Sequence, residues 1–294
     1  MLRGRLGIET ARVPHADRHG LIWLSHGSLY VEDGTLRFKT SGGSDLPRGD
    51  YAIPFQMVSC VVLQPGTTVS HDSLRLLARH GTGVVAVGDG GVRLYASMPF
   101  GPDDSSLARR QVTLWSDAEG SRISVARRLY AWRLGEVLPH ADIAVLRGIE
   151  GSRAKVSYQR IAEQFGIEWA SRKFDRSKPD AADAPNQAIN HAATAVQAAA
   201  MVAVSVCGAL PSLGFIHEDS GISFVLDIAD LYRDSITLPV AFGAVKEWRK
   251  RPEEPLERVV RKLSGRLFRE KQLVSAMIDR VKELLQHDDD HRNG

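Results

Sequence analysis

The chain has very few cysteines and no long leucine-rich segment. Among its 294 residues, cysteine occurs at Cys60 and Cys207, and both lie in apolar runs. Two isolated cysteines argue against a disulfide framework and indicate buried free thiols in a reducing compartment. The longest run of low charge, Ala188 to Leu210, is rich in alanine and includes polar residues such as Asn190. It therefore predicts a buried helix and not a membrane span. No cleavable signal pattern opens the chain, so we expect a cytoplasmic protein.

The chain also lacks the signatures of nucleotide-hydrolysing proteins and of repeat proteins. Its Gly-rich turn, Gly88 to Gly91, has no Gly-Lys-Ser/Thr ending and leads into a predicted strand, so it is not a phosphate-binding loop. No repeat of fixed period is visible. The composition is 43% hydrophobic and 25% charged, which is ordinary for a globular chain of one large domain or two. The net charge of +3 is small, so the clustering of charges matters more than their sum.

The hydrophobic pattern divides the chain into a strand-rich part and a helical part. Residues 1–97 contain short apolar runs separated by turns, with predicted hairpins around Glu32-Asp33-Gly34 and around Gly88 to Gly91. Residues 98–106, with proline, glycine and acids, form the predicted linker. Residues 107–286 carry apolar side chains at helical spacing, and 287–294 form a predicted disordered tail. The predicted fold class is α+β, with an N-terminal β-sheet domain followed by a larger all-α domain.

Within the helical part, the spacing of apolar residues predicts several separate helices. The predicted ranges are Leu107–Trp115, Ile123–Leu134, Ser152–Phe165 and Asn186–Cys207, with one or two basic helices over Pro255–Gln286. The alanines of the fourth range would let neighbouring helices approach closely, which suits the centre of a bundle.

One stretch, Gly214 to Arg233, concentrates residues that suit metal chemistry. His217 precedes a short turn and an apolar run that ends in acids. If the run up to Asp234 is helical, Asp227, Asp230 and Asp234 share one face. Two acids and an imidazole beside a buried apolar stripe suit a divalent metal ion. Acids on a helix edge are also commonly just solvated, and the residues alone leave both interpretations open.

A second stretch, Leu146 to Gly151, places the single acid Glu150 between glycines, with basic residues around it. The runs R-G-I-E-G, G-F-I-H and S-F-V-L-D-I-A-D together resemble the spacer-acquisition integrase of CRISPR systems, CRISPR-associated protein 1, in its type I-E branch. The resemblance extends over about residues 10–285. Three ordered motifs at family spacing are far more specific than any one of them.

The resemblance implies that Glu150, His217 and Asp230 form the catalytic site and bind a divalent ion, Mg²⁺ or Mn²⁺. Without it, a helix acid, a buried histidine and a surface acid would be the simpler interpretation. Asp227, one turn before Asp230, is expected either to support these ligands or to be a direct ligand itself. The implied reaction joins the 3′-OH ends of captured protospacer DNA to the CRISPR repeat by transesterification. Because no Ser, Cys or Tyr in the motifs has an activating partner, we expect water or a DNA 3′-OH as the nucleophile.

The resemblance also implies DNA-contact residues and partners. Arg75, Arg93, Arg258 and Arg261 match family positions that contact the DNA backbone, although each would also suit a solvated surface. His26 stands where a relative has a tyrosine that stacks on the end of a DNA duplex, and an imidazole stacks over less area. The implied partners are double-stranded protospacer DNA, CRISPR repeat DNA and CRISPR-associated protein 2, bound by homodimers of the chain.

Two other functions remain open from the sequence. A free-standing metal-dependent nuclease on branched DNA would use the same three ligands, with water in place of the 3′-OH. A non-catalytic nucleic-acid-binding scaffold would not need the ligands at all.

Overall fold

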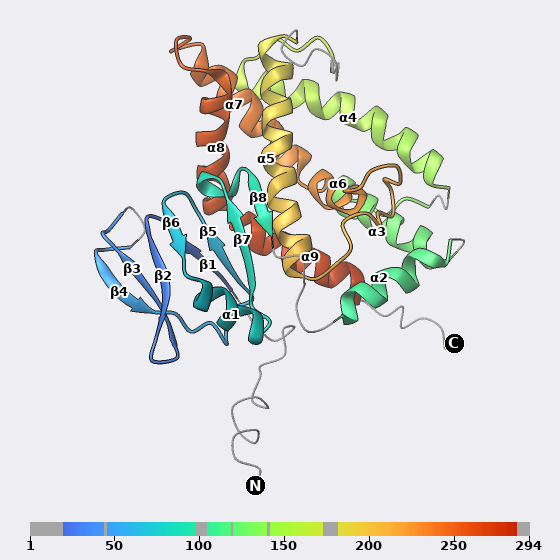
Figure 1. The fold of residues 1–294 in the computed structure, drawn as a ribbon. Coiled ribbons are helices and arrows are strands. Elements are labelled where there is room, and N and C mark those ends of the chain that lie inside the picture. The colour runs from blue at the N-terminus through green and yellow to red at the C-terminus, as the bar shows by residue number, and fades with distance from the viewer. Residues whose placement is uncertain are drawn as a thin grey trace.

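The computed structural model describes residues 20–43, 46–97, 105–118, 120–139, 142–172 and 182–286. Strands occupy the N-terminal part of the described chain and helices dominate the rest (Figure 1). This arrangement confirms the predicted α+β class. Most of the predicted linker, 98–104, and all of the predicted tail, 287–294, lie outside the described residues.

The strand-rich domain contains two four-stranded sheets. The first sheet contains β1 (Leu21–Leu24), β5 (Cys60–Leu63), β7 (Gly83–Val87) and β8 (Leu94–Ser97), in that spatial order. The strand β8 is antiparallel to β7, and the other neighbouring pairs are parallel. The second sheet contains β4 (Gly49–Ala52), β3 (Thr35–Thr40), β2 (Gly27–Glu32) and β6 (Thr67–Val69), in that spatial order. The strand β6 is parallel to β2, and the other neighbouring pairs are antiparallel. The helix α1 (His71–Arg79) packs beside β2 and β7. Both predicted hairpins are confirmed, the β2–β3 pair and the β7–β8 pair.

The helical domain is built from eight α-helices within the described residues. They are α2 (Ser106–Ser116), α3 (Ser121–Leu134), α4 (Ile143–Phe165), α5 (Ala184–Val206), α6 (Ser223–Asp230), α7 (Leu238–Trp248), α8 (Leu256–Glu270) and α9 (Leu273–Gln286). The predicted basic segment is two helices, separated at Gln272, whose backbone adopts φ +47°. Ser106, the last residue of the predicted linker, already belongs to α2.

Two helix boundaries near the candidate site differ from those considered in the sequence, and one of them was a wrong prediction. The helix predicted from Ser152 begins at Ile143, so Glu150 lies inside α4 and not at its start. Asp142 caps this helix by accepting a hydrogen bond from the N–H of Ala144 at 2.7 Å. The condition that the run is helical up to Asp234 is not met, because α6 ends at Asp230 and a π-helical turn over Arg233–Thr237 follows. Asp234 therefore does not continue the helical face of Asp227 and Asp230.

The helix α5 occupies the centre of the helical domain (Figure 1). It contacts α6, α7, α8 and α9, and most of its alanines are buried, as the sequence predicted. By length and composition it could cross a membrane, but it is largely covered by its neighbours. Cys207 at its end and Cys60 on β5 are both buried free thiols, and burial raises the pKa of each to about 12.

One hydrophobic cluster spans the two domains, and the strand-rich domain has a second cluster of its own. Val62 and Val85 of the first sheet pack with the buried residues of α5 and α8 in a single cluster. The backbones of the two domains approach closely at the turn between β7 and β8, where a Cβ built on Gly90 would lie 2.6 Å from the Cα of Gly265 on α8. Glycine at position 90 therefore allows backbone-to-backbone contact between the domains.

Candidate metal centre and DNA-contact residues

The buried carboxylate of Asp227 on α6 holds the loop that carries His217. One of its oxygens accepts hydrogen bonds from the N–H groups of Phe215 and Ile216, at 2.6 and 3.1 Å. The other accepts from the N–H of His217 at 3.0 Å and lies 2.7 Å from the Nδ1 of the same residue. A carboxylate offers about four acceptor sites, so these four contacts occupy Asp227 fully. Of the two roles expected for it, the geometry favours support of His217 over direct contact with an ion.

This loop is closed tightly and is tied to α4. A Cβ on Gly214 would lie 2.3 Å from the carbonyl oxygen of His217, so no larger residue fits there. Arg147 of α4 donates a hydrogen bond to the carbonyl oxygen of Ile216 at 2.9 Å. The motif around Glu150 and the motif around His217 are therefore joined by a direct contact.

The imidazole of His217 has one nitrogen engaged and one directed toward the other acids. While Nδ1 faces Asp227, Nε2 lies 4.0 Å from the Oδ2 of Asp230. The hydrogen bond with Asp227 raises the pKa of His217, burial lowers it in part, and the net direction is upward. A histidine whose Nδ1 is held by a carboxylate presents Nε2 in a defined direction, as in many metal sites.

Glu150 and Asp230 converge on the same place through two arginines. Glu150 comes from α4, Asp230 is the last residue of α6, Arg133 comes from α3 and Arg233 begins the π-helical turn. Arg133 forms ion pairs with Glu150 and with Asp230, the latter at 3.2 Å. Arg233 also pairs with both acids, at 3.4 Å from Glu150 and 2.5 Å from Asp230. The structure thus places His217 beside Asp230 and links Glu150 to Asp230 through two arginines that the sequence analysis did not assign.

The residues fit a divalent ion in their chemistry. The 4.0 Å between Nε2 of His217 and Oδ2 of Asp230 is less than twice a metal–ligand distance of about 2.1 Å, so one ion can contact both. Glu150 is held near Asp230 by the shared guanidiniums. Among the described residues, no group of three His, Cys, Asp or Glu is arranged around one point as it stands, because the arginines lie between the acids. A metal ion would need these guanidiniums to move.

A hollow of about 570 Å³ opens beside Glu150. Its lining includes the half-buried rings of Tyr158 and Trp169, which stack with centroids 5.2 Å apart. Lys155 and Arg233 add positive charge to the wall. A space with aromatic faces and cations next to Glu150 has the chemistry to take a nucleotide, because bases stack on rings and phosphates pair with cations.

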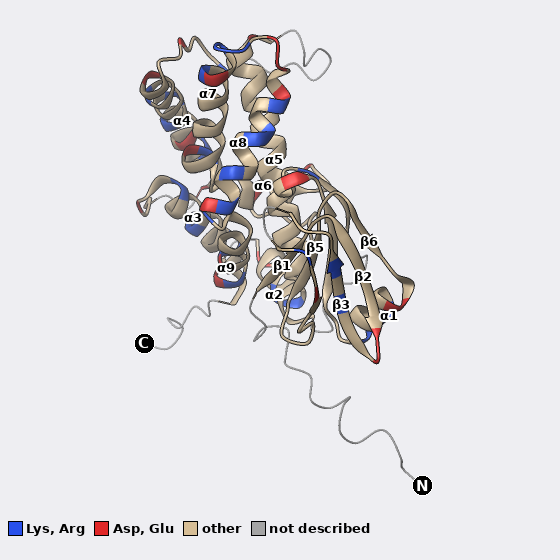
Figure 2. Cartoon of the chain, turned by 90° about the vertical axis from the view of Figure 1, so that its left-hand side faces the viewer, with Lys and Arg blue, Asp and Glu red and all other residues tan. Residues whose placement is uncertain are grey.

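Three of the four predicted DNA-contact arginines lie on one side of the molecule. Arg93 follows the β7–β8 turn and forms an ion pair with Glu257 of α8. Arg93 and Arg261 line the same small hollow between the domains, and Arg258 is exposed one turn earlier on α8. Basic residues recur along this helix (Figure 2). The sequence also allowed these arginines to be ordinary solvated surface residues. The ion pair of Arg258 with Glu254, at 3.4 Å, is compatible with that alternative for this one residue.

Arg75 and His26 lie elsewhere. Arg75 is on α1, at the end of the strand-rich domain away from α8 in both views, and it pairs with Asp72 at 2.9 Å (Figures 1 and 2). His26 is exposed in the turn between β1 and β2, where its backbone adopts φ +53°. The structure does not gather these two residues with the arginines of α8.

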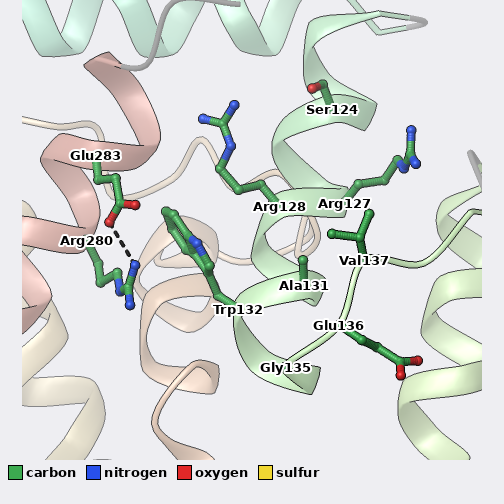
Figure 3. Close-up of a pocket in the computed structure, with 10 residues that line it drawn as sticks. All are labelled: Ser124, Arg127, Arg128, Ala131, Trp132, Gly135, Glu136, Val137, Arg280 and Glu283. Atoms are coloured by element: carbon green, nitrogen blue, oxygen red, sulfur yellow. Dashed lines mark hydrogen bonds and ion pairs between the residues drawn. The ribbon is translucent and has the colours of Figure 1, made fainter.

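A second basic hollow, of about 650 Å³, lies between α3 and α9. Arg127 and Arg128 extend from α3 on either side of it, and Arg280 of α9 stacks over Trp132 at 4.6 Å (Figure 3). Arg280 is also paired with Glu283 at 2.7 Å. Arg133, the next residue after Trp132, belongs to the acid pair, so α3 presents arginines to two separate places.

Of the residues that the sequence analysis did not assign, Arg233 had a local signal and Arg133 had none. Arg233 stands three positions after Asp230, a spacing at which side chains on helical turns meet. Arg133 is 97 positions from Asp230, and nothing in its neighbourhood marks it out from the other arginines of α3.

The site combines an imidazole held by a buried acid, two further acids and flanking arginines, on a helical domain packed against a β-sheet domain. This set of groups suits a protein that acts on phosphodiesters. Comparison with known proteins identifies the family. A family model described as CRISPR associated protein Cas1 matches residues 132–254. The CRISPR-associated endonuclease Cas1 of Escherichia coli K12 is 35% identical over 276 residues, which cover 93% of this chain and 87% of that protein.

Further relatives agree with this match. The CRISPR-associated endonuclease Cas1 of Geobacter sulfurreducens is 34% identical over 276 residues, covering 93% of this chain and 86% of that protein. The solved structure described as a TtCas1-DNA complex superposes with a TM-score of 0.82 at 31% identity, covering 92% of this chain and 98% of that one. The chain belongs to the Cas1 family of CRISPR-associated proteins. The predicted family is confirmed, and the E. coli match fits the type I-E branch.

Proposed function

We propose that this chain is a metal-dependent DNA integrase of CRISPR adaptation, which joins the 3′-OH ends of captured protospacer DNA to the CRISPR repeat by transesterification. The observation that carries the proposal is the approach of His217 to Asp230, with Glu150 linked to Asp230 by two shared arginines and with Asp227 holding the imidazole. Membership of the Cas1 family supports it, since the relatives are named CRISPR-associated endonucleases.

Glu150, His217 and Asp230 would hold a Mg²⁺ or Mn²⁺ ion, because carboxylate oxygens and a neutral imidazole suit both. Such an ion, when bound, neutralises charge on the phosphoryl oxygens and lowers the pKa of an attacking hydroxyl. The chain's own part is to orient these groups. Asp227 keeps Nδ1 of His217 engaged, which leaves the Nε2 lone pair available once the ring is neutral. Arg133 and Arg233 place two guanidiniums where a phosphate would arrive.

Residues outside the centre would hold DNA. Arg93, Arg258 and Arg261 form the proposed backbone-binding surface across the two domains, and Arg75 and His26 are proposed as separate contacts. A relative solved in complex with DNA, TtCas1, shares the fold over most of both chains, which supports DNA as the substrate. The hollow beside Glu150 would take a nucleotide next to the reacting phosphate. We further propose, from the family resemblance, a cytoplasmic homodimer that works with CRISPR-associated protein 2.

The test separates integration from hydrolysis. A short duplex with free 3′ ends is incubated with a supercoiled plasmid that carries the repeat, together with the partner protein and Mg²⁺ or Mn²⁺. We expect covalent joining of the duplex to the plasmid. The same duplex ending in 2′,3′-dideoxynucleotides should not be joined, because the attacking oxygen is missing.

Two results would favour the rival functions. Plasmid cleavage at full rate with the blocked duplex, and no joining of the unblocked one, would make water the nucleophile and the chain a nuclease on branched DNA. Unchanged joining after replacement of Glu150, His217 or Asp230 would place the chemistry elsewhere and leave this chain as a nucleic-acid-binding scaffold.

A further inference from the structure

The acid pair of the candidate centre already has its own counter-charge. Arg133 and Arg233 each contact both Glu150 and Asp230, and one oxygen of Glu150, Oε1, receives both guanidiniums. The side chain of Arg133 is only 12% exposed and that of Glu150 only 14%. This is therefore a mostly enclosed set of ion pairs and not a surface contact, so it is only weakly screened by salt.

The charges of these four groups cancel, with two carboxylates against two guanidiniums. A divalent ion added to the set would leave an excess of two positive charges in a partly enclosed space. Asp227 carries a third negative charge beside His217, so with a neutral imidazole the excess over all six groups is one positive charge. The negative charge that is missing must come from outside the protein.

A phosphodiester supplies this charge in a form that suits the arginines. The planar guanidinium fork binds phosphate oxygens in the same paired manner as it binds a carboxylate. Moving the guanidiniums from the acids onto a DNA phosphate frees Glu150 and Asp230 and lowers the excess of positive charge in one exchange. No group on the chain needs to be left unpaired.

We propose that Arg133 and Arg233 are an internal counter-cation that occupies the acid pair until a DNA phosphate draws them away, so that loading of DNA and loading of metal are coupled. This inference rests on the proposed function, because it takes DNA as the ligand and a divalent ion as the cofactor. Coupling of two ligands is reciprocal and typically changes affinity by roughly 5- to 150-fold. DNA should therefore tighten metal binding, and metal should tighten DNA binding to the same extent.

The experiment measures Mn²⁺ binding to the full chain by isothermal titration calorimetry, with and without a duplex whose 3′ ends are blocked by dideoxynucleotides. We expect the duplex to lower the Kd for Mn²⁺ by about tenfold in the wild type, within the usual range for coupled ligands. In Arg133→Gln, Mn²⁺ should bind several-fold more tightly without DNA, because a competing cation is gone, and the duplex should then add less. Direct contact between DNA and the ion could couple them in the wild type, but it would not tighten DNA-free binding in the variant.

Arg128→Gln is the matched control. It removes the same charge from the same helix, at a residue that lines the separate hollow beside Trp132 and Arg280 (Figure 3). Its Mn²⁺ affinity and its response to DNA should equal those of the wild type. If circular dichroism shows that Arg133→Gln does not fold, Arg233→Gln takes its place, since Arg233 contacts the same two acids and is more exposed.

The outcomes separate this inference from the function on which it rests. Weaker or equal Mn²⁺ binding by a folded arginine variant without DNA, or an undiminished effect of the duplex, overturns the counter-cation even if the wild type joins DNA. Absence of Mn²⁺ binding by the wild type, with and without DNA, overturns the proposed metal centre and this inference together.

Discussion

Replacing Asp227 by asparagine changes one carboxylate oxygen into an NH₂ group and keeps the shape of the side chain. In the native protein the two oxygens accept hydrogen bonds from the N–H groups of Phe215, Ile216 and His217 and contact the Nδ1 of His217. Two of these four contacts fall on each oxygen. Whichever way the new amide is turned, its NH₂ group therefore faces two groups that previously donated to an acceptor.

The expected cost follows from these contacts. A hydrogen bond to a charged group contributes about 1.5–3 kcal/mol, and a buried donor left without an acceptor costs about 1–3 kcal/mol. Asp227 is 1% exposed, so water cannot replace the lost acceptor. With two donors affected, we expect the free energy of unfolding to fall by about 3–5 kcal/mol, a large part of the 5–15 kcal/mol that is typical of folded domains. Loop order around His217, and with it metal affinity, should fall as well.

The same substitution has a pH signature. The hydrogen bond with Asp227 is the largest factor that raises the pKa of His217, so the variant should show a lower pKa for that ring. A raised pKa in the folded state contributes stability that is fully present below the unfolded value of about 6.5 and is lost as pH rises through the folded value. The stability difference between the wild type and Asp227→Asn should therefore be larger below pH 6.5 than above the folded pKa of His217.

The assay is denaturant unfolding of the metal-free protein at several pH values, combined with NMR titration of the His217 ring. Asp219→Asn is the matched control, because it makes the same change in charge at an exposed position of the same loop. A variant at position 227 that unfolds within about 0.5 kcal/mol of the wild type would refute the reasoning, since that is the range of an ordinary surface substitution. Lost metal binding with unchanged stability would instead make Asp227 a direct ligand.

Other substitutions test the site, the DNA surface and the domain contact. His217→Ala should abolish joining in Mg²⁺ and in Mn²⁺ while DNA binding persists, and joining at the wild-type rate in Mn²⁺ would contradict its assignment as a ligand. The double variant Arg258→Ala with Arg261→Ala should weaken DNA binding similarly across DNA sequences. In filter-binding measurements the slope of log K against log salt should become shallower by about 0.9 per lost phosphate contact. An unchanged slope would mean that these side chains face solvent. Gly90→Ala should lower the free energy of unfolding by about 1–3 kcal/mol, because the native φ is +64° and the new Cβ would lie 2.6 Å from a Cα atom of α8. Wild-type stability in the unfolding assay would show that the domains can separate there without cost.

The division into a strand-rich half and a helical half, and the order of most elements along the chain, follow from the local hydrophobic pattern of the amino-acid sequence. Strands alternate with turn residues up to Ser97, and apolar residues then recur at helical spacing, so the α+β class needed no long-range information. The start of α4 was misplaced because Gly148 and Gly151 weaken the local preference for helix, each by about 1 kcal/mol, and packing overrides that preference. The end of α6 at Asp230 could not be predicted, because the π-helical turn after it has no distinct sequence pattern.

The chain order of the motifs was enough to suggest which acids and which histidine belong together, through their resemblance to a family. It was not enough to show how they meet. Arg133 reaches Asp230 across 97 positions, and Arg93 reaches Glu257 across 164, so these contacts depend on how helices and sheet pack against each other. The burial of Asp227 and the four groups around its carboxylate likewise come from the tertiary structure, and they favour support of His217 over direct contact with an ion. Periodicity in a sequence reports which face of an element is apolar, whereas the partner of a charged side chain depends on the neighbouring element that packing brings within a few ångströms.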